Sequence, residues 1–208
     1  MGLKSRKGLE SFCAELSSDR PSPGGGSASA ASGAMAASLL EMVCGITRAK
    51  KSYEKHWKEL DEVSGRMALK RAELVSLAEE DAEAYDKVVE AMRGRREKDT
   101  AGRRKAVELS LIAAAEVPIR TAGACVEVLD AALRLAEIGT RSAASDVGVA
   151  VLLAHAGLRG ATMNVAINLQ GISERSFAER AKGEVDRANR DADEIVRNAL
   201  GKLEKSIG

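Results

Sequence analysis

One carboxylate, Asp81, lies on an apolar helix face. At about 100° per residue, the apolar side chains around it form a stripe less than about 90° wide, and Asp81 lies in the middle of that stripe. Burying a carboxylate raises its pKa unless the group is fully paired, which suits a general acid or base near neutral pH. An aspartate satisfied by a helix N-terminus or an arginine gives the same pattern, and spacing alone favours that structural role. The stripe consists of Leu74, Leu77, Tyr85, Val88 and Met92.

Two asparagines, Asn164 and Asn168, project side by side from another helix, because they are four residues apart. The same helix face begins at Asp146 and otherwise carries small or apolar residues. Two amides on such a face could form the floor of a pocket for a flat polar heterocycle, since each can donate and accept hydrogen bonds. A hydrogen-bonded pair between helices in the core is an equally consistent alternative.

A glycine-rich segment leads directly into a helix. Its glycines, Gly24, Gly25 and Gly26, leave the backbone N–H groups of the helix N-terminus open to an anionic or carbonyl group. The spacing matches neither the phosphate-binding P-loop nor the dinucleotide fingerprint. Lys50 and Lys51 end the same helix, where cations complement the helix dipole and could also hold the acidic tail of a substrate.

The elements that must position these residues are helices, because the composition predicts an all-α protein. Aromatic residues make up only 2% of the 208 residues, whereas glycine alone occurs 19 times and alanine is more frequent still. A β-sandwich or barrel needs aromatic and β-branched side chains on its sheets, while small residues suit helices that approach closely. The shortage of aromatics also argues against a stacking platform for single-stranded nucleic acid.

Hydrophobic periodicity predicts a single-domain bundle of six to eight helices over residues 1–208. Two helices, 27–51 and 142–170, are apolar on nearly every face and are expected at the centre. The core is expected to span about 9–177, followed by a charged C-terminal helix over 173–207. The other predicted helices are 5–18; 53–92, as one helix or as two with a break near Ser64–Gly65; 103–116, ending or kinking at Val117–Pro118; and 119–138.

Charge and cysteine usage exclude several classes of protein. The balance of 32 Lys+Arg against 31 Asp+Glu gives no sign of a nucleic-acid partner. Cys13, Cys44 and Cys125 match no disulfide or metal-ligand spacing, which predicts small buried thiols and no metal site. The most apolar stretch, 28–47, is interrupted by serines and Glu41 and is a poor membrane span. We therefore expect a cytoplasmic protein with no membrane partner.

Four segments carry motifs that belong together. They are Pro21-Ser-Pro-Gly-Gly-Gly-Ser with Gly33-Ala-Met-Ala-Ala-Ser-Leu; Lys50-Lys-Ser-Tyr; Asp81-Ala-Glu-Ala-Tyr; and Ser145-Asp-Val-Gly-Val-Ala through Asn164-Val-Ala-Ile-Asn-Leu. In this order and spacing they resemble the cyclodeaminase/cyclohydrolase family of folate enzymes. That family includes the C-terminal domain of formimidoyltransferase-cyclodeaminase and the stand-alone methenyltetrahydrofolate cyclohydrolases. The resemblance runs from about residue 9 to 177, and Ala-Glu-Val-Pro118-Ile adds a further match.

The resemblance implies an all-helical homodimer whose substrate is a one-carbon-loaded tetrahydrofolate. The cyclohydrolase adds water to 5,10-methenyltetrahydrofolate and gives 10-formyltetrahydrofolate. The cyclodeaminase closes the ring of 5-formimidoyltetrahydrofolate and releases ammonia. Both reactions pass through a tetrahedral carbon between N5 and N10 and need proton transfer but no metal or redox cofactor. The 208 residues leave no room for a transferase domain, so the stand-alone form is expected, and the cyclohydrolase is slightly favoured.

The resemblance also assigns roles to residues. Asp81 matches the family's catalytic aspartate and is the expected general acid/base. The segment from Gly24 to Gly26 is expected to approach the substrate rings, and Lys50 and Lys51 its glutamate tail. The substrate-binding positions matched with less definite roles are Asp146, Asn164 and Asn168. The family often has Gly-Asn before the Ser-Asp motif, where this chain has Gly139-Thr-Arg, so substrate specificity could differ there.

A non-catalytic helical dimer, acting as a scaffold or a folate-binding protein, is the alternative hypothesis. It gives no reason for Asp81, Asn164 and Asn168 to meet at one cavity beside the glycine-rich segment. An enzyme requires that these residues lie within the width of one substrate.

Overall fold

The chain folds into helices, and no strand occurs in residues 6–94 and 101–207, which the structure, a computed structural model, describes. This confirms the all-α prediction. Within these described residues six α-helices follow one another, with two short 3₁₀ helices between them. The α-helices are α1 (Arg6–Leu16), α2 (Gly25–Arg48), α3 (Trp57–Gly94), α4 (Ala101–Ile138), α5 (Ala144–Leu169) and α6 (Arg175–Ile207), and the 3₁₀ helices are η1 (Lys51–His56) and η2 (Arg141–Ala143).

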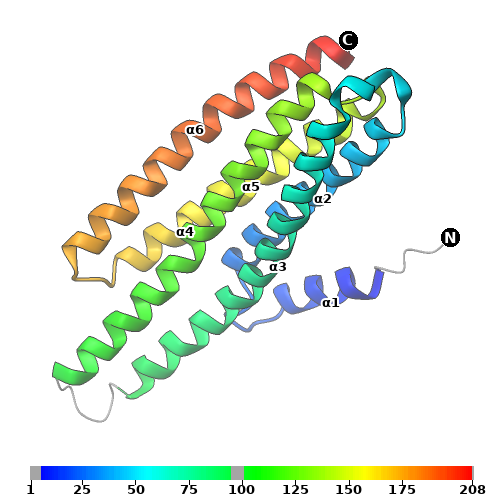
Figure 1. Cartoon of the computed structure of the whole chain (residues 1–208). Helices are drawn as coiled ribbons and strands as arrows, with labels where there is room; N and C mark the ends of the chain where they lie inside the picture. The colour runs from blue at the N-terminus through cyan, green and yellow to red at the C-terminus, as the bar shows by residue number, and fades with distance from the viewer. Residues whose placement is uncertain (1–5, 95–100, 208) are drawn as a thin grey trace.

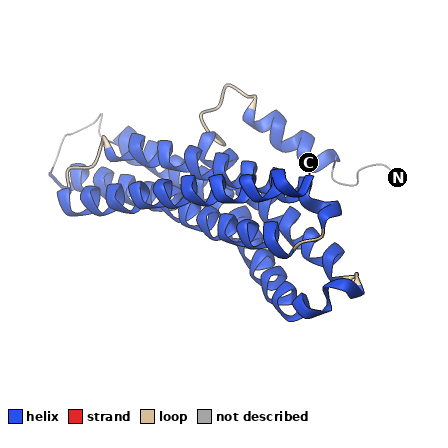
Figure 2. Ribbon diagram, turned by 90° about the horizontal axis from the view of Figure 1, so that it is seen from above, coloured by secondary structure: helices blue, strands red, loops and turns tan. Residues whose placement is uncertain are grey.

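Helices α2 to α6 run side by side as a long bundle, while α1 projects from it (Figure 1; Figure 2). Helix α2 packs against α3, α4 and α5, and α5 packs against α2, α4 and α6. The two helices predicted to be central therefore share the middle of the bundle with α4, which packs against α2, α3, α5 and α6, and each of the two also keeps an exposed apolar face. The charged C-terminal helix α6 covers α4 and α5 from one side.

Small residues allow α2 and α5 to approach closely. A Cβ on Gly157 would lie 2.7 Å from the carbonyl oxygen of Ser29, and one on Gly33 would lie 2.8 Å from the sulfur of Cys125. Ala30 and Ala154 are fully buried. The abundance of glycine and alanine is thus used where the two central helices and α4 meet.

Helix α3 is continuous, although the sequence left open a break near Ser64–Gly65. The chain first makes one 3₁₀ segment, η1, and α3 then runs unbroken from Trp57 to Gly94. Buried Leu60, Val63 and Met67 continue the apolar stripe through this region. Their burial outweighs the roughly 1 kcal/mol helix penalty of one glycine.

Helix α4 is also continuous, and the prediction of separate helices on either side of Val117–Pro118 is wrong. Pro118 lies inside α4 and is buried. A proline lacks the N–H that would bond to the carbonyl of Ala114, four residues earlier. The side-chain amide of Asn168 on α5 donates to that carbonyl at 3.2 Å instead, and so compensates for part of the cost of the proline.

Three helical segments are long and apolar enough to cross a membrane, judged by length and composition only. They are α2, α4 and residues 141–169, with mean hydropathies of 1.4, 1.4 and 1.2 over their most apolar windows. The prediction that 28–47 is a poor membrane span is therefore not supported by mean hydropathy. Between 44% and 50% of each window is buried inside the bundle.

Candidate active site

The glycine-rich segment brings the N-terminus of α2 against the middle of α3. Gly24 is the N-cap residue of α2 and has no side chain to satisfy the first N–H groups. Asp81 of the neighbouring helix α3 satisfies one of them: the hydroxyl of Ser27 donates to Oδ2 of Asp81 at 3.1 Å, and the backbone N–H of Ser27 donates to the same carboxylate. A Cβ on Gly26 would overlap the Asp81 carboxylate, so any other residue at this position would displace that carboxylate.

The environment of Asp81 raises the pKa of its carboxyl group above that of an exposed aspartate. Burial raises the pKa of Asp81, and the two Ser27 donors oppose that rise without cancelling it. The structure thus combines both interpretations of the sequence: the aspartate is paired with a helix N-terminus, and its pKa is raised. A carboxyl group in this state can take up and release a proton closer to neutral pH than an exposed aspartate.

Asp81 faces a cavity of about 450 Å³, a volume within the usual range for small-molecule sites. The cavity lies between the start of α2 and parts of α3, α4 and α5. It brings together six of the predicted site residues: Gly24, Gly25, Gly26, Asp81, Asn164 and Asn168. The other lining residues are Pro21, Ser22, Tyr85, Val88, Val89, Met92, Leu111, Ala114, Ile167 and Gly171.

The two asparagines use their amides differently. Asn164 Nδ2 donates to the carbonyl of Gly160 within α5 at 2.9 Å and lies 3.7 Å from where a Cβ of Gly25 would be. Asn168 Nδ2 donates to Ala114 of α4. Each amide therefore has a donor engaged with the protein, and each also carries a carbonyl oxygen that can accept a hydrogen bond from a ligand in the cavity.

Tyr85 is a lining residue to which the sequence assigned no role. It lies one helical turn after Asp81, and 39% of it is exposed. Among the described residues that line the cavity it is the sole aromatic. Its position on the Asp81 stripe, four residues after the aspartate, is the signal that could have identified it.

Lys50, Lys51 and Asp146 do not line this cavity. Helix α2 is 24 residues long, so its two ends lie about 36 Å apart at 1.5 Å per residue, and the lysines follow the far end. Lys50 Nζ donates to the hydroxyls of Thr140 and Ser142 at 2.7 and 2.8 Å. Thr140, at the position where the sequence departs from the Gly-Asn of the family that it resembles, therefore contacts Lys50 and does not line the cavity.

The lining of the cavity holds no lysine or arginine among the residues that the structure describes. The same part of the chain contains no group of three or more His, Cys, Asp or Glu side chains that could hold a metal ion. Within the described lining, Asp81 and Tyr85 are the two ionisable side chains. The cavity thus offers one carboxyl group, amides and backbone groups on an otherwise apolar surface.

Comparison with known proteins relates the chain to folate enzymes. The sequence model of the formiminotransferase-cyclodeaminase family matches residues 8–187. The chain is 39% identical over 180 residues to the methenyltetrahydrofolate cyclohydrolase of Methylorubrum extorquens, and the match covers 86% of each protein. It is 29% identical to the formimidoyltransferase-cyclodeaminase of Sus scrofa, over 95% of this chain but 37% of that longer protein. The crystal structure of formiminotetrahydrofolate cyclodeaminase from Thermotoga maritima superposes with a TM-score of 0.89 at 32% identity, covering 96% of this chain and 97% of that one.

Proposed function

The chain belongs to the formiminotransferase-cyclodeaminase family, and we propose that it is a methenyltetrahydrofolate cyclohydrolase. It is a folate one-carbon enzyme, as both kinds of relative are. The higher identity to a cyclohydrolase, over most of both chains, supports hydrolysis over deamination. The observation that carries the proposal is the partly buried Asp81 carboxyl group at the wall of a cavity large enough for a substrate.

In the proposed reaction Asp81 first acts as a general base. Its carboxylate takes a proton from a water molecule, whose oxygen bonds to the methenyl carbon between N5 and N10. The positive charge of the methenyl group is neutralised, and a tetrahedral carbon forms. Because burial raises the pKa of Asp81, the carboxyl group can keep this proton until the next step.

Asp81 then acts as a general acid. It returns the proton to N5 as the bond between that nitrogen and the tetrahedral carbon breaks. The hydroxyl group on the carbon loses its proton to solvent and becomes the carbonyl of 10-formyltetrahydrofolate. Ser27 holds the Asp81 carboxylate through its hydroxyl and backbone N–H, and this keeps one oxygen of the carboxylate oriented in both steps.

The rest of the cavity suits a flat, partly polar substrate. Tyr85 and the aliphatic lining can pack against the rings, since flat rings bind well to aromatic and apolar walls. Gly24, Gly25 and Gly26 allow the backbone to approach the rings closely. The carbonyl oxygens of Asn164 and Asn168 can accept hydrogen bonds from the pterin. In the proposed reaction the tetrahydrofolate derivative is the substrate, and no further cofactor is required.

We also propose a homodimer formed through an exposed apolar face of α2 and α5. These helices pack against each other, and together they carry seven large apolar side chains that are between 39% and 66% exposed. An exposed apolar patch of this kind is typical of a protein interface. The seven are Met35, Met42, Ile46, Val149, Leu152, Met163 and Ile167, the last of which also lines the cavity.

A dimer with a two-fold axis across the middle of α2 would give Lys50 and Lys51 a role. The two copies of α2 would run antiparallel, and the partner subunit's Lys50 and Lys51 would approach the cavity. There they could bind the anionic glutamate tail of the substrate. Asp146, in the first turn of α5, would approach with them. Mixing Asp81→Asn subunits with Lys50→Gln/Lys51→Gln subunits should then restore activity, whereas a monomeric protein in light scattering would contradict the arrangement.

An absorbance assay tests the reaction. Purified protein should remove the absorbance of 5,10-methenyltetrahydrofolate faster than a protein-free reaction, with no amine added. Formation of that absorbance from 5-formimidoyltetrahydrofolate would instead identify a cyclodeaminase. Tight folate binding with neither reaction would favour the alternative of a folate-binding protein, and no binding at all would favour a scaffold. We keep the cytoplasmic location as part of the proposal, to be tested by cell fractionation.

A further inference from the structure

Pro118 creates a gap in the hydrogen bonding of α4. In a regular helix the N–H of residue 118 would donate to the carbonyl of Ala114. Proline has no N–H, and its ring crowds the carbonyl four residues earlier, so this carbonyl loses the donor that residue 118 would supply. Ala114 is only 8% exposed, and a buried carbonyl without a donor is unfavourable.

The missing donor comes from α5. Asn168 Nδ2 donates to the carbonyl of Ala114 at 3.2 Å and joins the two helices. Asn164, one turn earlier, donates to the carbonyl of Gly160 in its own helix. No proline follows four residues after Gly160. Of these two bonds, only the one from Asn168 fills a gap that a proline creates, and both Ala114 and Asn168 line the cavity.

We propose that Pro118 is a positioning residue for the cavity, which it serves by making the Ala114 carbonyl the anchor of the Asn168 amide. The NH₂ group of Asn168 is then fixed toward α4, and its carbonyl oxygen is the atom left for the substrate. A proline that weakens its own helix is thereby used to set the orientation of a side chain 50 residues later. This inference deepens the proposed function, and only its kinetic consequence rests on that function.

The kinetic test is Pro118→Ala. The new N–H at residue 118 should restore the helical bond, compete with Asn168 for the carbonyl of Ala114 and release the Asn168 amide. We expect a melting temperature at least equal to that of the original protein, because proline is unfavourable inside a helix. We expect KM for methenyltetrahydrofolate to rise about five- to tenfold, as for one lost hydrogen bond, with kcat within about twofold. An unchanged KM would overturn the proposal.

A stability test needs no folate. Asn168→Ala should lower the melting temperature by roughly 2–6 °C while Pro118 is present, because the Ala114 carbonyl then has no donor. The same substitution in a Pro118→Ala background should cost little, since the backbone supplies the donor. Asn164→Ala is the matched control and should have the same effect in both backgrounds. Equal costs of Asn168→Ala in the two backgrounds would overturn the proposal, whether or not the protein turns over folate.

Discussion

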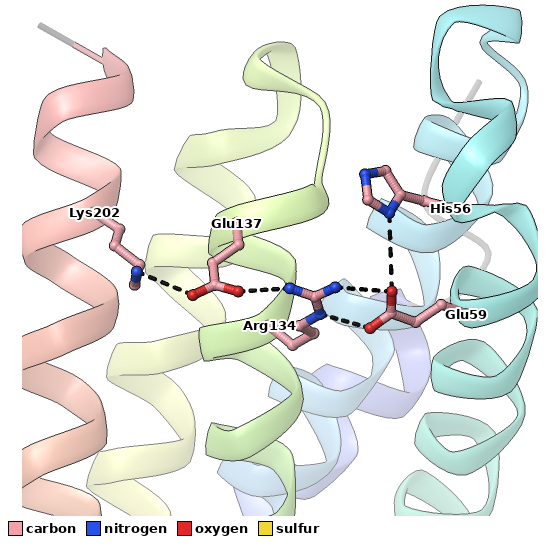
Figure 3. Close-up of polar contacts among 5 residues, drawn as sticks. All are labelled: His56, Glu59, Arg134, Glu137 and Lys202. Carbon is pink, nitrogen blue, oxygen red and sulfur yellow. Dashed lines mark hydrogen bonds and ion pairs between the residues drawn. The ribbon is translucent and has the colours of Figure 1, made fainter.

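The N-terminal and C-terminal ends of α2 lie about 36 Å apart. The polar side chains that other helices place near these two ends differ in what they contact. Beyond the C-terminal end, charged groups pair with one another. Arg134 contacts Glu59 through two bonds of 2.5 and 2.9 Å and Glu137 through one of 2.6 Å, and Lys202 contacts Glu137 at 3.0 Å (Figure 3). This network ties α3, α4 and α6 together.

At the N-terminal end, polar groups are held by the protein but still face a cavity. Asp81 is bonded to Ser27, Asn164 to Gly160 and Asn168 to Ala114, yet all three side chains line the cavity. Polar side chains are paired at both ends, so pairing alone does not separate structural from functional polar residues. A hollow of about 630 Å³ also lies beside Glu137 and Lys202, so open volume does not separate the two ends either. What separates them is burial: the side chains of the charged network are 35–45% exposed, whereas burial raises the pKa of Asp81.

Among the variants that keep Asp81, the largest effect is expected for Gly26→Ala. The new methyl group would overlap the Asp81 carboxylate and force it away from Ser27. Because general acid–base groups contribute on the order of 10²–10⁴, kcat/KM should fall at least about 100-fold. Gly65→Ala on α3 is the control: a Cβ there meets nothing within 4 Å, so stability should rise by about 0.5–1 kcal/mol with no change in activity. If Gly26→Ala kept its activity, the contact between Asp81 and Ser27 at the N-terminal end of α2 would not be needed for catalysis.

A smaller effect is expected for Asn164→Ala. The substitution removes a possible acceptor for substrate from the cavity, so KM should rise about five- to tenfold. Asn198→Ala, at an exposed position of α6 near the opposite end, is the matched control and should leave KM unchanged. If the two variants had the same KM, Asn164 would be a structural residue like those of the opposite end.

The reverse outcome is expected for Arg134→Gln, which should change stability but not catalysis. The side chains of Arg134 and Glu59 are 41% and 35% exposed, so the loss should be only about 0.5–1 kcal/mol, or a few degrees in melting temperature. Hydrogen bonding to Arg134 lowers the pKa of Glu59 below its usual value. A carboxylate with a lowered pKa stabilises the fold above its unfolded pKa, and that contribution is lost as pH falls. Melting curves of the two proteins should therefore converge below about pH 4, and a kcat/KM that fell together with stability would contradict the separation of the two ends.

The smallest effect concerns the cysteines. Burial raises the pKa of Cys125 to about 12, and burial together with Asp61 and Glu41 raises that of Cys44 to about 11. Cys13 is exposed, so the prediction that all three thiols are buried is wrong for this one. A thiol reagent at pH 8 should therefore modify one cysteine in the folded protein and all three in denaturant, since the thiolate is the reactive form. Rapid modification of Cys125, which lies against Gly33 and Gly157, would show that the centre of the bundle opens.

The sequence predicts most of this fold because helices follow from local periodicity. Asp81 could be singled out because a carboxylate on an apolar stripe is a local pattern. The continuity of α4 through Pro118 could not be predicted in the same way, because the compensating donor is Asn168 on another helix. The assignment of Lys50 and Lys51 to an acidic substrate tail rests on their charge and on the resemblance, although the predicted helix already places them a helix length away from Gly24–Gly26. Whether a second subunit closes that distance depends on an interface that no local pattern specifies.

The assignment of Asp81 as the general acid/base is tested by the rate at which Asp81→Asn hydrolyses methenyltetrahydrofolate, with Asp86→Asn as the control. The amide that replaces the Asp81 carboxylate can still accept from Ser27 and fill the same volume, so folding should be preserved, and melting curves can verify this. Asp86 is an exposed aspartate on the same helix. We predict a loss in kcat on the order of 10²–10⁴ for Asp81→Asn and no loss for Asp86→Asn. A folded Asp81→Asn protein that retains activity within a few-fold would contradict the assignment of Asp81 as the general acid/base.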